Sequence, residues 1–158
     1  MTDKERYMQV LEWEHATTLK VMKAFPADKL SFKPHQRSLS AHDLMMRFVG
    51  EQMLMASLPS GGFDAPPAGM NKEMSIDQIL NMYEEGFMKV VKILKNMSEE
   101  DFNNKMTSFF GNKMKMADAF WMPVKDQIHH RGQLSVYIRL AGGKVPSIYG
   151  PSADEPGM

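Results

Sequence analysis

Hydrophobic residues recur at helical spacing along four long stretches of the chain. The stretches cover residues 3–25, 38–58, 75–97 and 116–140. Within each one, apolar side chains return every three or four residues, which places them on one face of an α-helix. No segment shows the sustained apolar and polar alternation of a half-buried strand. The pattern therefore predicts an all-α protein, a four-helix bundle.

Local signals set the ends of these helices. Ser38 or Ser40 can cap the second helix, and Ser75 opens the third. The last helix is expected to begin near Met116 and to end at the pair Gly142–Gly143. The segment between the third and last helices has a weaker pattern, in which Gly111–Asn112 turns the chain, with a short extended pair around it as one alternative.

Proline and glycine mark two irregular parts. Residues 59–70, with the sequence PSGGFDAPPAGM, are predicted to form a long loop after the second helix. Residues 144–158 form an irregular tail that we expect to pack on the helices. The chain has no internal repeat, and its 158 residues suit one domain with a sizeable core, so residues 1–158 are interpreted as a single domain.

Charge and composition exclude several classes of function. Basic and acidic residues number 19 each, which gives no electrostatic reason to expect a nucleic-acid partner. We find no run of 18 apolar residues and no charged-then-apolar leader, so we expect a soluble cytoplasmic protein without a membrane partner. The absence of cysteine excludes disulfides, thiolate zinc sites and a cysteine nucleophile. Any metal must be held by nitrogen and oxygen ligands.

The chain contains 17 methionines, which lie mostly at predicted core positions. We interpret them as flexible filler of a helical core, with a methionine-lined ligand surface as the alternative.

The candidate chemistry lies on one stripe of the last helix. Asp126 and His130 are four residues apart, and the same stripe continues to Tyr137 and Leu140, which we expect to face the core. An Asp/His pair at this spacing directs both side chains to one place, as two metal ligands require.

Arg47 lies on or beside the inward face of the second helix, where its charge needs compensation. Glu51, one turn later, could supply that compensation by an ordinary ion pair within the helix. His15 on the first helix is a further candidate ligand, although a buried core histidine is the simpler interpretation.

Two stretches resemble one known family. IHHRGQLSVYIRLAGGKVPSIYGPSADE is similar to the last helix and tail of the DinB/YfiT-like superfamily, and RSLSAHDLM resembles the opening of its second helix. The resemblance implies an up-down-down-up bundle of four helices, often dimeric. It also implies a divalent ion bound by one histidine of the second helix and an H-x-x-x-H pair of the fourth. Relatives include metal-dependent thiol S-transferases that use low-molecular-weight thiols such as bacillithiol or mycothiol.

This chain departs from the family pattern at two of the three ligand positions. His130 matches the final histidine, but Asp126 and Arg47 stand where the resemblance implies histidines. We expect Arg47, Asp126 and His130 to form a binding site rebuilt as a hydrogen-bonded ion pair, with no cofactor. The alternatives are a retained divalent metal, nickel or zinc, on Asp126, His130 and waters, with or without another residue, or three unconnected side chains.

Three functions follow from these alternatives. The preferred one is a protein of unproven activity that binds a small molecule or is associated with stress, with an altered metal site. The second is a metal-dependent thiol S-transferase. The third is a non-catalytic structural homodimer.

Overall fold

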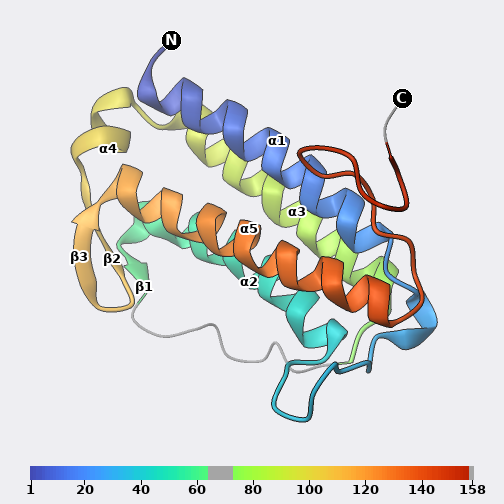
Figure 1. The fold of residues 1–158 in the computed structure, drawn as a ribbon. Coiled ribbons are helices and arrows are strands. Elements are labelled where there is room, and N and C mark those ends of the chain that lie inside the picture. The colour runs from blue at the N-terminus through green and yellow to red at the C-terminus, as the bar shows by residue number, and fades with distance from the viewer. Residues whose placement is uncertain (64–72, 157–158) are drawn as a thin grey trace.

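The computed structural model describes residues 1–63 and 73–156. Four long helices dominate it, as the sequence predicts: α1 (Asp3–Lys23), α2 (Ala41–Ser57), α3 (Ile76–Asn96) and α5 (Met116–Leu140). Both α1 and α2 pack against α3 and against α5. Along the chain, α1 and α5 run in one direction and α2 and α3 in the other (Figure 1).

The predicted helix starts are confirmed by their caps. The Ser40 hydroxyl accepts a hydrogen bond from the Asp43 backbone N–H at the start of α2. Ser75 and Gln78 form a capping box at the start of α3. At its C-terminus α5 is followed by Gly142 with φ +83°, a left-handed conformation that suits glycine.

A small sheet corrects the all-α prediction. Strands β2 (Met106–Phe109) and β3 (Asn112–Lys115) form an antiparallel hairpin, and β1 (Gly62–Phe63) pairs in parallel with β2. A short helix, α4 (Glu99–Asn104), precedes the hairpin, and all of these elements gather at one end of the molecule (Figure 1). The turn at Gly111 and the extended pair around it, which were one alternative predicted from the sequence, are confirmed. Strand β1 has only two residues and a distant partner, so no periodicity indicates it.

Gly62 explains why β1 can approach β2 so closely. A Cβ atom at this position would lie 1.7 Å from the Ser108 carbonyl oxygen, and the glycine has φ +81°. The described part of the loop predicted for residues 59–70 begins with the end of a single-turn helix (Leu58–Ser60). Strand β1 follows it. Residues 64–70 lie outside the described residues. A second single-turn helix, Ala27–Lys29, follows α1.

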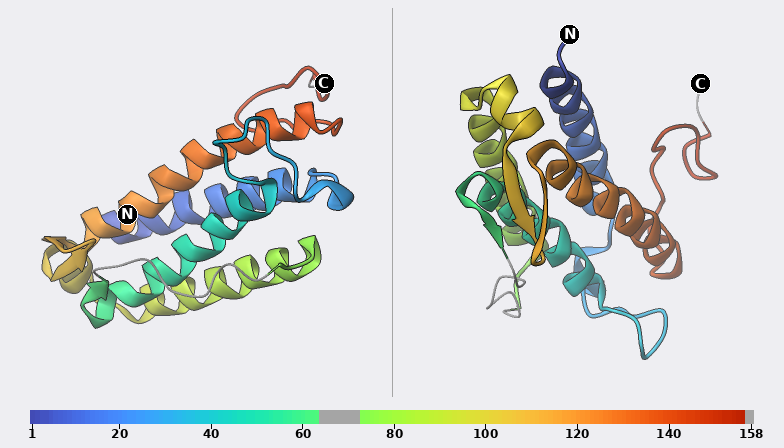
Figure 2. Two further views of the ribbon diagram at one scale, coloured as in Figure 1. Left: turned by 90° about the horizontal axis from the view of Figure 1, so that it is seen from below. Right: turned by 90° about the vertical axis from the view of Figure 1, so that its left-hand side faces the viewer.

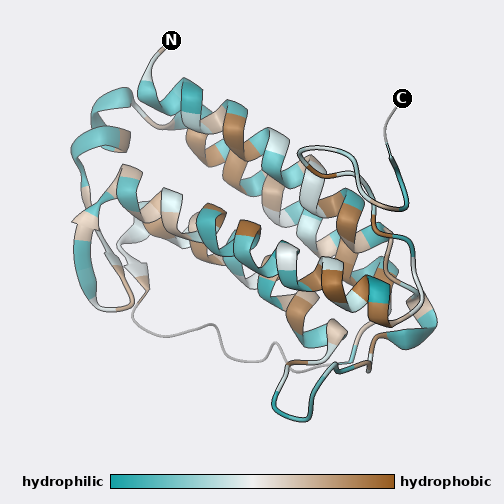
Figure 3. Cartoon of the chain, viewed as in Figure 1, coloured by the Kyte–Doolittle hydropathy of each residue, from teal (hydrophilic) through white to brown (hydrophobic). Residues whose placement is uncertain are grey.

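Hydrophobic side chains fill the space between the long helices in two adjoining clusters. One is built around Phe48, Tyr83 and Leu134, and the other around Tyr7 and Phe120 near the sheet. Figure 3 shows hydrophobic residues recurring along the long helices, whereas α4 is mainly hydrophilic. The methionine prediction holds in part: five helical methionines are buried, namely Met22, Met45, Met46, Met55 and Met116, but Met53, Met88 and Met122 are exposed.

The tail is irregular, as predicted, and it is tied to the helices. The Lys20 ammonium lies 2.9 Å from a Glu155 carboxylate oxygen, and Arg139 pairs with Asp154 at 2.8 Å. A hydrogen bond from the Ser147 backbone N–H, followed in effect by one from Lys20, lowers the pKa of the exposed Glu155 carboxyl to about 2. The views of Figure 2 show the tail running back beside the helices.

Candidate functional site

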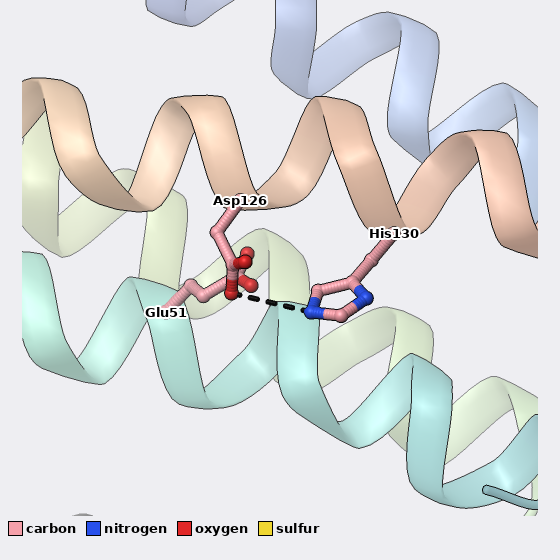
Figure 4. Close-up of side chains that lie close together, drawn as sticks. All are labelled: Glu51, Asp126 and His130. Atoms are coloured by element: carbon pink, nitrogen blue, oxygen red, sulfur yellow. Dashed lines mark ion pairs between the residues drawn. The ribbon is translucent and has the colours of Figure 1, made fainter. Parts of the chain in front are cut away.

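Asp126 and His130 project from consecutive turns of α5 toward α2. The His130 Nε2 atom lies 3.3 Å from Asp126 Oδ2, and Figure 4 marks this contact. His130 is buried, whereas the Asp126 side chain is almost half exposed. On the same stripe Tyr137 is buried as expected, but Leu140 is exposed because it ends the helix. The structure therefore brings this predicted pair together at the surface of the core.

Glu51 is the third member of the group. It projects from α2 toward the α5 pair, and one potential ligand atom from each of Glu51, Asp126 and His130 lies within 4.8 Å of the others (Figure 4). Neither Glu51 carboxylate oxygen has a hydrogen-bond partner among the described residues, although both are buried. The sequence indicated Glu51 only as a partner for Arg47, and the described residues contain no such ion pair. The contact across the helices could not be derived from spacing along α2 alone.

Burial raises the pKa of Glu51 well above its ordinary value, and the nearby Asp126 raises it further. The Arg47 charge acts in the opposite direction with a smaller effect. Glu51 is thus either a carboxylic acid that donates a hydrogen bond to Asp126 or a carboxylate that needs a cation beside it. The second state leaves the position chemically incomplete, because the buried oxygens then lack a partner.

Arg47 lies at the outer edge of this group. Its Nη2 atom is 3.7 Å from Asp126 Oδ2, and about half of each side chain is exposed. The expected hydrogen-bonded fork is therefore wrong in its detail: the distance is that of an exposed ion pair, which contributes little to stability. A half-exposed arginine does not need the close compensation that an inward one requires.

Gln133 orients the His130 ring. The Gln133 Oε1 atom lies 3.0 Å from His130 Nδ1, so Nδ1 carries the proton when the imidazole is neutral. The Nε2 lone pair then faces the two carboxylates. A hydrogen bond on the far nitrogen is the usual support of a metal-binding histidine. The Gln133 Nε2 atom also lies 3.0 Å from His129 Nε2.

The donor set of Glu51, Asp126 and His130 could hold a divalent metal ion. Two carboxylates and one imidazole suit Mn²⁺, Fe²⁺, Co²⁺, Ni²⁺ or Zn²⁺ and leave coordination positions open. The unmatched buried oxygens of Glu51 are the observation that makes this fit, because an ion would provide their missing partner.

A cavity of about 1060 Å³ opens beside the group, lined by residues of α2, α5 and the sheet. Arg47, Glu51 and Asp126 lie on its polar side. Its apolar lining comes mainly from Met46, Leu54, Met122, Phe63, Phe109 and Phe110. His130 lines a second, smaller hollow of about 420 Å³ together with Gln133 and Tyr137. The group of Glu51, Asp126 and His130 thus borders both the large pocket and the smaller one.

His15, the spare ligand candidate, lies elsewhere. Its ring stacks between Tyr83 and Phe87, with centroid distances of 4.6 Å and 3.7 Å. Burial, with a smaller effect of Lys23, lowers the pKa of His15 to about 4, so the ring is neutral near pH 7. The buried core histidine is the interpretation that this geometry supports.

A second ionic group, in which Arg131 pairs with Glu14, was not predicted from the sequence. Arg131, adjacent to His130, turns toward α1, where its Nη1 atom lies 2.7 Å from a Glu14 carboxylate oxygen and 3.2 Å from the Thr18 hydroxyl. The Tyr149 hydroxyl from the tail donates to Glu14 at 2.8 Å and accepts a hydrogen bond from Arg131. Arg131 and Glu14 are both buried. The sequence signal was an arginine at helical spacing from Val124, Leu134 and Ile138, all of which are buried.

A comparison with protein families gives a match to the model of the DinB family over residues 1–157. The chain belongs to the DinB family. This confirms the resemblance drawn from the last helix and tail.

Two relatives of this DinB-family chain come from Bacillus subtilis (strain 168), and both are named only as uncharacterized proteins. YjoA is 30% identical over 118 residues, which span 73% of this chain and 75% of YjoA. YrdA is 24% identical over 151 residues, 96% of this chain and 90% of YrdA. Neither name states an activity.

Solved structures agree in fold. A DinB-like protein from Bacillus cereus ATCC 10987 gives a TM-score of 0.81 at 22% identity, covering 92% of this chain and 97% of that one. The structure of the DinB-like YjoA from Bacillus subtilis gives 0.66 at 25% identity, covering 85% and 92%. Within the described residues, none of the helices combines the length and the apolar character that crossing a membrane demands.

Proposed function

We propose that this DinB-family protein binds a small molecule in the pocket beside α2 and α5, at a divalent metal ion held by Glu51, Asp126 and His130. One observation carries the proposal: the buried Glu51 carboxylate has no hydrogen-bond partner among the described residues and faces two further ligand atoms. A bound cation offsets the cost of burying that charge.

This proposal revises the metal-free ion pair favoured by the sequence. Arg47 cannot bind a metal, but Glu51, one turn along α2, provides the donor that Arg47 lacks. The ligand on α2 therefore moves by one turn, from position 47 to Glu51, and is a carboxylate in place of the imidazole that the resemblance implies. Arg47 then lies beside the ion, where it can pair with an anionic ligand instead of coordinating the metal.

The ion would act as a Lewis acid toward a ligand oxygen or sulfur atom. The protein residues do the rest: Gln133 fixes the His130 ring, Glu51 supplies a charge held away from water, and the apolar pocket wall excludes solvent. The four long helices serve as the rigid frame, which we propose to be the up-down-down-up four-helix bundle of the family.

A metal-dependent thiol S-transferase is the second candidate. The observation that favours it is a three-residue donor set beside a large pocket, which leaves room for a thiol and an electrophile. In that reaction a thiolate sulfur bonds to an electrophilic carbon while the leaving group departs with its electron pair. It ranks second because two carboxylates make a harder site than three imidazoles and suit a thiolate less well.

Calorimetric titration with Mn²⁺, Co²⁺, Ni²⁺ and Zn²⁺ tests the metal site, using protein purified without a histidine tag. We expect one ion per chain, and affinity that falls by more than about tenfold in Glu51→Gln and His130→Ala, since even an outer partner of a ligand contributes that much. Glu84→Gln, an exposed carboxylate on α3, is the matched control and should bind as the parent does. A parent that binds none of the four ions would overturn the proposal.

Cytoplasmic location, association with stress and a homodimeric state also stay proposals, and they rest on the sequence and its resemblance alone.

A further inference from the structure

Three phenylalanines form one wall of the large pocket. Phe63 ends β1, Phe109 ends β2, and Phe110 begins the turn between β2 and β3. Their rings meet edge to face, with centroids 4.6 Å apart for Phe63 and Phe110 and 5.1 Å apart for Phe109 and Phe110. Edge-to-face rings leave flat faces available to another ring.

The backbone holds this wall in place. The Phe110 N–H donates a hydrogen bond to the Phe63 carbonyl oxygen at 3.0 Å, and β1 is paired with β2 beside it. These main-chain contacts fix the wall of Phe63, Phe109 and Phe110 as part of the sheet.

Phe110 occupies a position that its residue type does not favour. It has φ +49°, and Gly111 after it has φ +76°, so both central residues of this two-residue hairpin turn are left-handed. Such turns favour Asn–Gly, and a bulky aromatic residue at the first position is strained. The ring is also nearly half exposed. Neither turn geometry nor burial explains a phenylalanine here, whereas its place on the pocket wall does.

With a divalent ion bound, the polar lining of the pocket favours an anion. Its lining contains the carboxylates of Asp43, Glu51 and Asp126 and the cations of Arg47 and Lys125, so a bound divalent ion changes the local charge from negative to positive. Among the residues that the structure describes, the ion pair of Arg47 is the one with Asp126 at 3.7 Å, which leaves its planar fork available to a carboxylate or similar oxyanion.

We infer that the pocket binds an aromatic oxyanion, whose ring packs on the wall of Phe63, Phe109 and Phe110 and whose charged group faces Arg47 and the metal. The inference rests on the proposed function, since it uses the ion held by Glu51, Asp126 and His130. Pocket and ligand are matched in character once the ion is bound: the lining then combines aromatic rings with a net positive charge.

Four probes separate these features in the zinc-loaded or manganese-loaded protein. 2-Naphthoate carries both the flat ring system and the charge, decahydro-2-naphthoate lacks flatness, 2-naphthamide lacks charge, and acetate lacks the rings. We expect 2-naphthoate to bind at least about tenfold more tightly than each of the others. Equal affinity for 2-naphthoate and decahydro-2-naphthoate would overturn the aromatic part of the inference.

The decisive variant is Phe110→Asn. Asparagine suits the turn, so the thermal midpoint and the metal affinity should be retained, while 2-naphthoate affinity falls by about tenfold. Phe110→Tyr should bind as the parent does, and so should Trp13→Leu, which removes an exposed aromatic ring from α1 outside the pocket. Unchanged naphthoate affinity in a folded Phe110→Asn protein would refute the wall.

Metal titration without any probe keeps the two proposals distinguishable. A protein that takes up the ion but shows no heat with 2-naphthoate refutes the aromatic oxyanion and leaves the metal site standing. A protein that takes up no ion refutes the proposed function.

Discussion

Helix α5 carries two ionic groups on different sides, and they differ in completeness. Toward α1, Arg131 reaches Glu14 and Thr18, and Tyr149 covers the pair from the tail. Toward α2, Asp126 and His130 meet Glu51, whose buried oxygens lack partners among the described residues. Both groups bring charge into or beside the core. Only the first satisfies that charge with protein atoms.

This difference separates a fixed structural contact from a binding site. A buried ion pair with all its partners fastens α5 to α1 and to the tail, and nothing is left over for a ligand. A group with a missing partner costs free energy until something binds to it. Charged residues on a helix are therefore weak evidence for a binding site, whereas buried polar atoms without hydrogen-bond partners are stronger evidence.

The largest expected effect comes from breaking the complete group. Arg131→Met leaves the Glu14 charge buried and should lower the free energy of unfolding by about 3–5 kcal/mol. Urea unfolding at pH 7 measures the loss. The double variant Arg131→Met with Glu14→Leu should recover most of it, because an apolar pair needs no compensation. A single variant that loses under about 1 kcal/mol would contradict the distinction.

The incomplete group should respond in the opposite direction. In metal-free protein, Glu51→Gln should raise the free energy of unfolding near pH 7 by about 1–3 kcal/mol, because it removes a buried carboxylate without a partner. Urea unfolding of both proteins in the presence of a chelator provides the measurement. A loss of stability would mean that the Glu51 charge is already compensated.

The pH dependence of that difference follows from the raised pKa of Glu51. A group whose pKa is higher in the folded state gives stability that is present below the unfolded pKa and is lost as pH rises through the folded pKa. The advantage of Glu51→Gln should therefore vanish near pH 4 and grow toward neutral pH. His15, with its pKa of about 4, also changes acid stability, but it does so equally in both proteins and cancels in the difference.

Asp126→Ala should have a small effect on the stability of metal-free protein, under about 1 kcal/mol, because the Arg47–Asp126 pair is half exposed. The same variant should lose metal affinity in calorimetry. A stability loss comparable to that of Arg131→Met would show that the two groups are alike.

The smallest effect is expected at Arg47. Arg47→Gln removes a positive charge beside the proposed ion and should raise metal affinity by about threefold to tenfold, since the repulsion amounts to roughly 1 kcal/mol at a solvent-exposed site. Raising the salt concentration should reduce the difference between variant and parent. Weaker metal binding in the variant would mean that Arg47 supports the site.

Local patterns predicted the helices well, because hydrophobic spacing and caps such as Ser40 and Ser75 depend on neighbours in sequence. They predicted the approach of Asp126 and His130 for the same reason. Glu51 and Glu14 were not predicted as cluster members, because their partners lie on other helices. The pairing of β1 with β2 likewise depends on a contact distant in sequence and on the close approach at Gly62.

The adjacency of His130 and Arg131 restricts how α5 can change in evolution. The two residues serve different groups because each step along a helix turns the side chain by about 100°. One residue inserted between Asp126 and Arg131 would rotate the later side chains out of register and separate both groups from their partners at once. Insertions and deletions should therefore be excluded from this single turn of α5 in homologous chains.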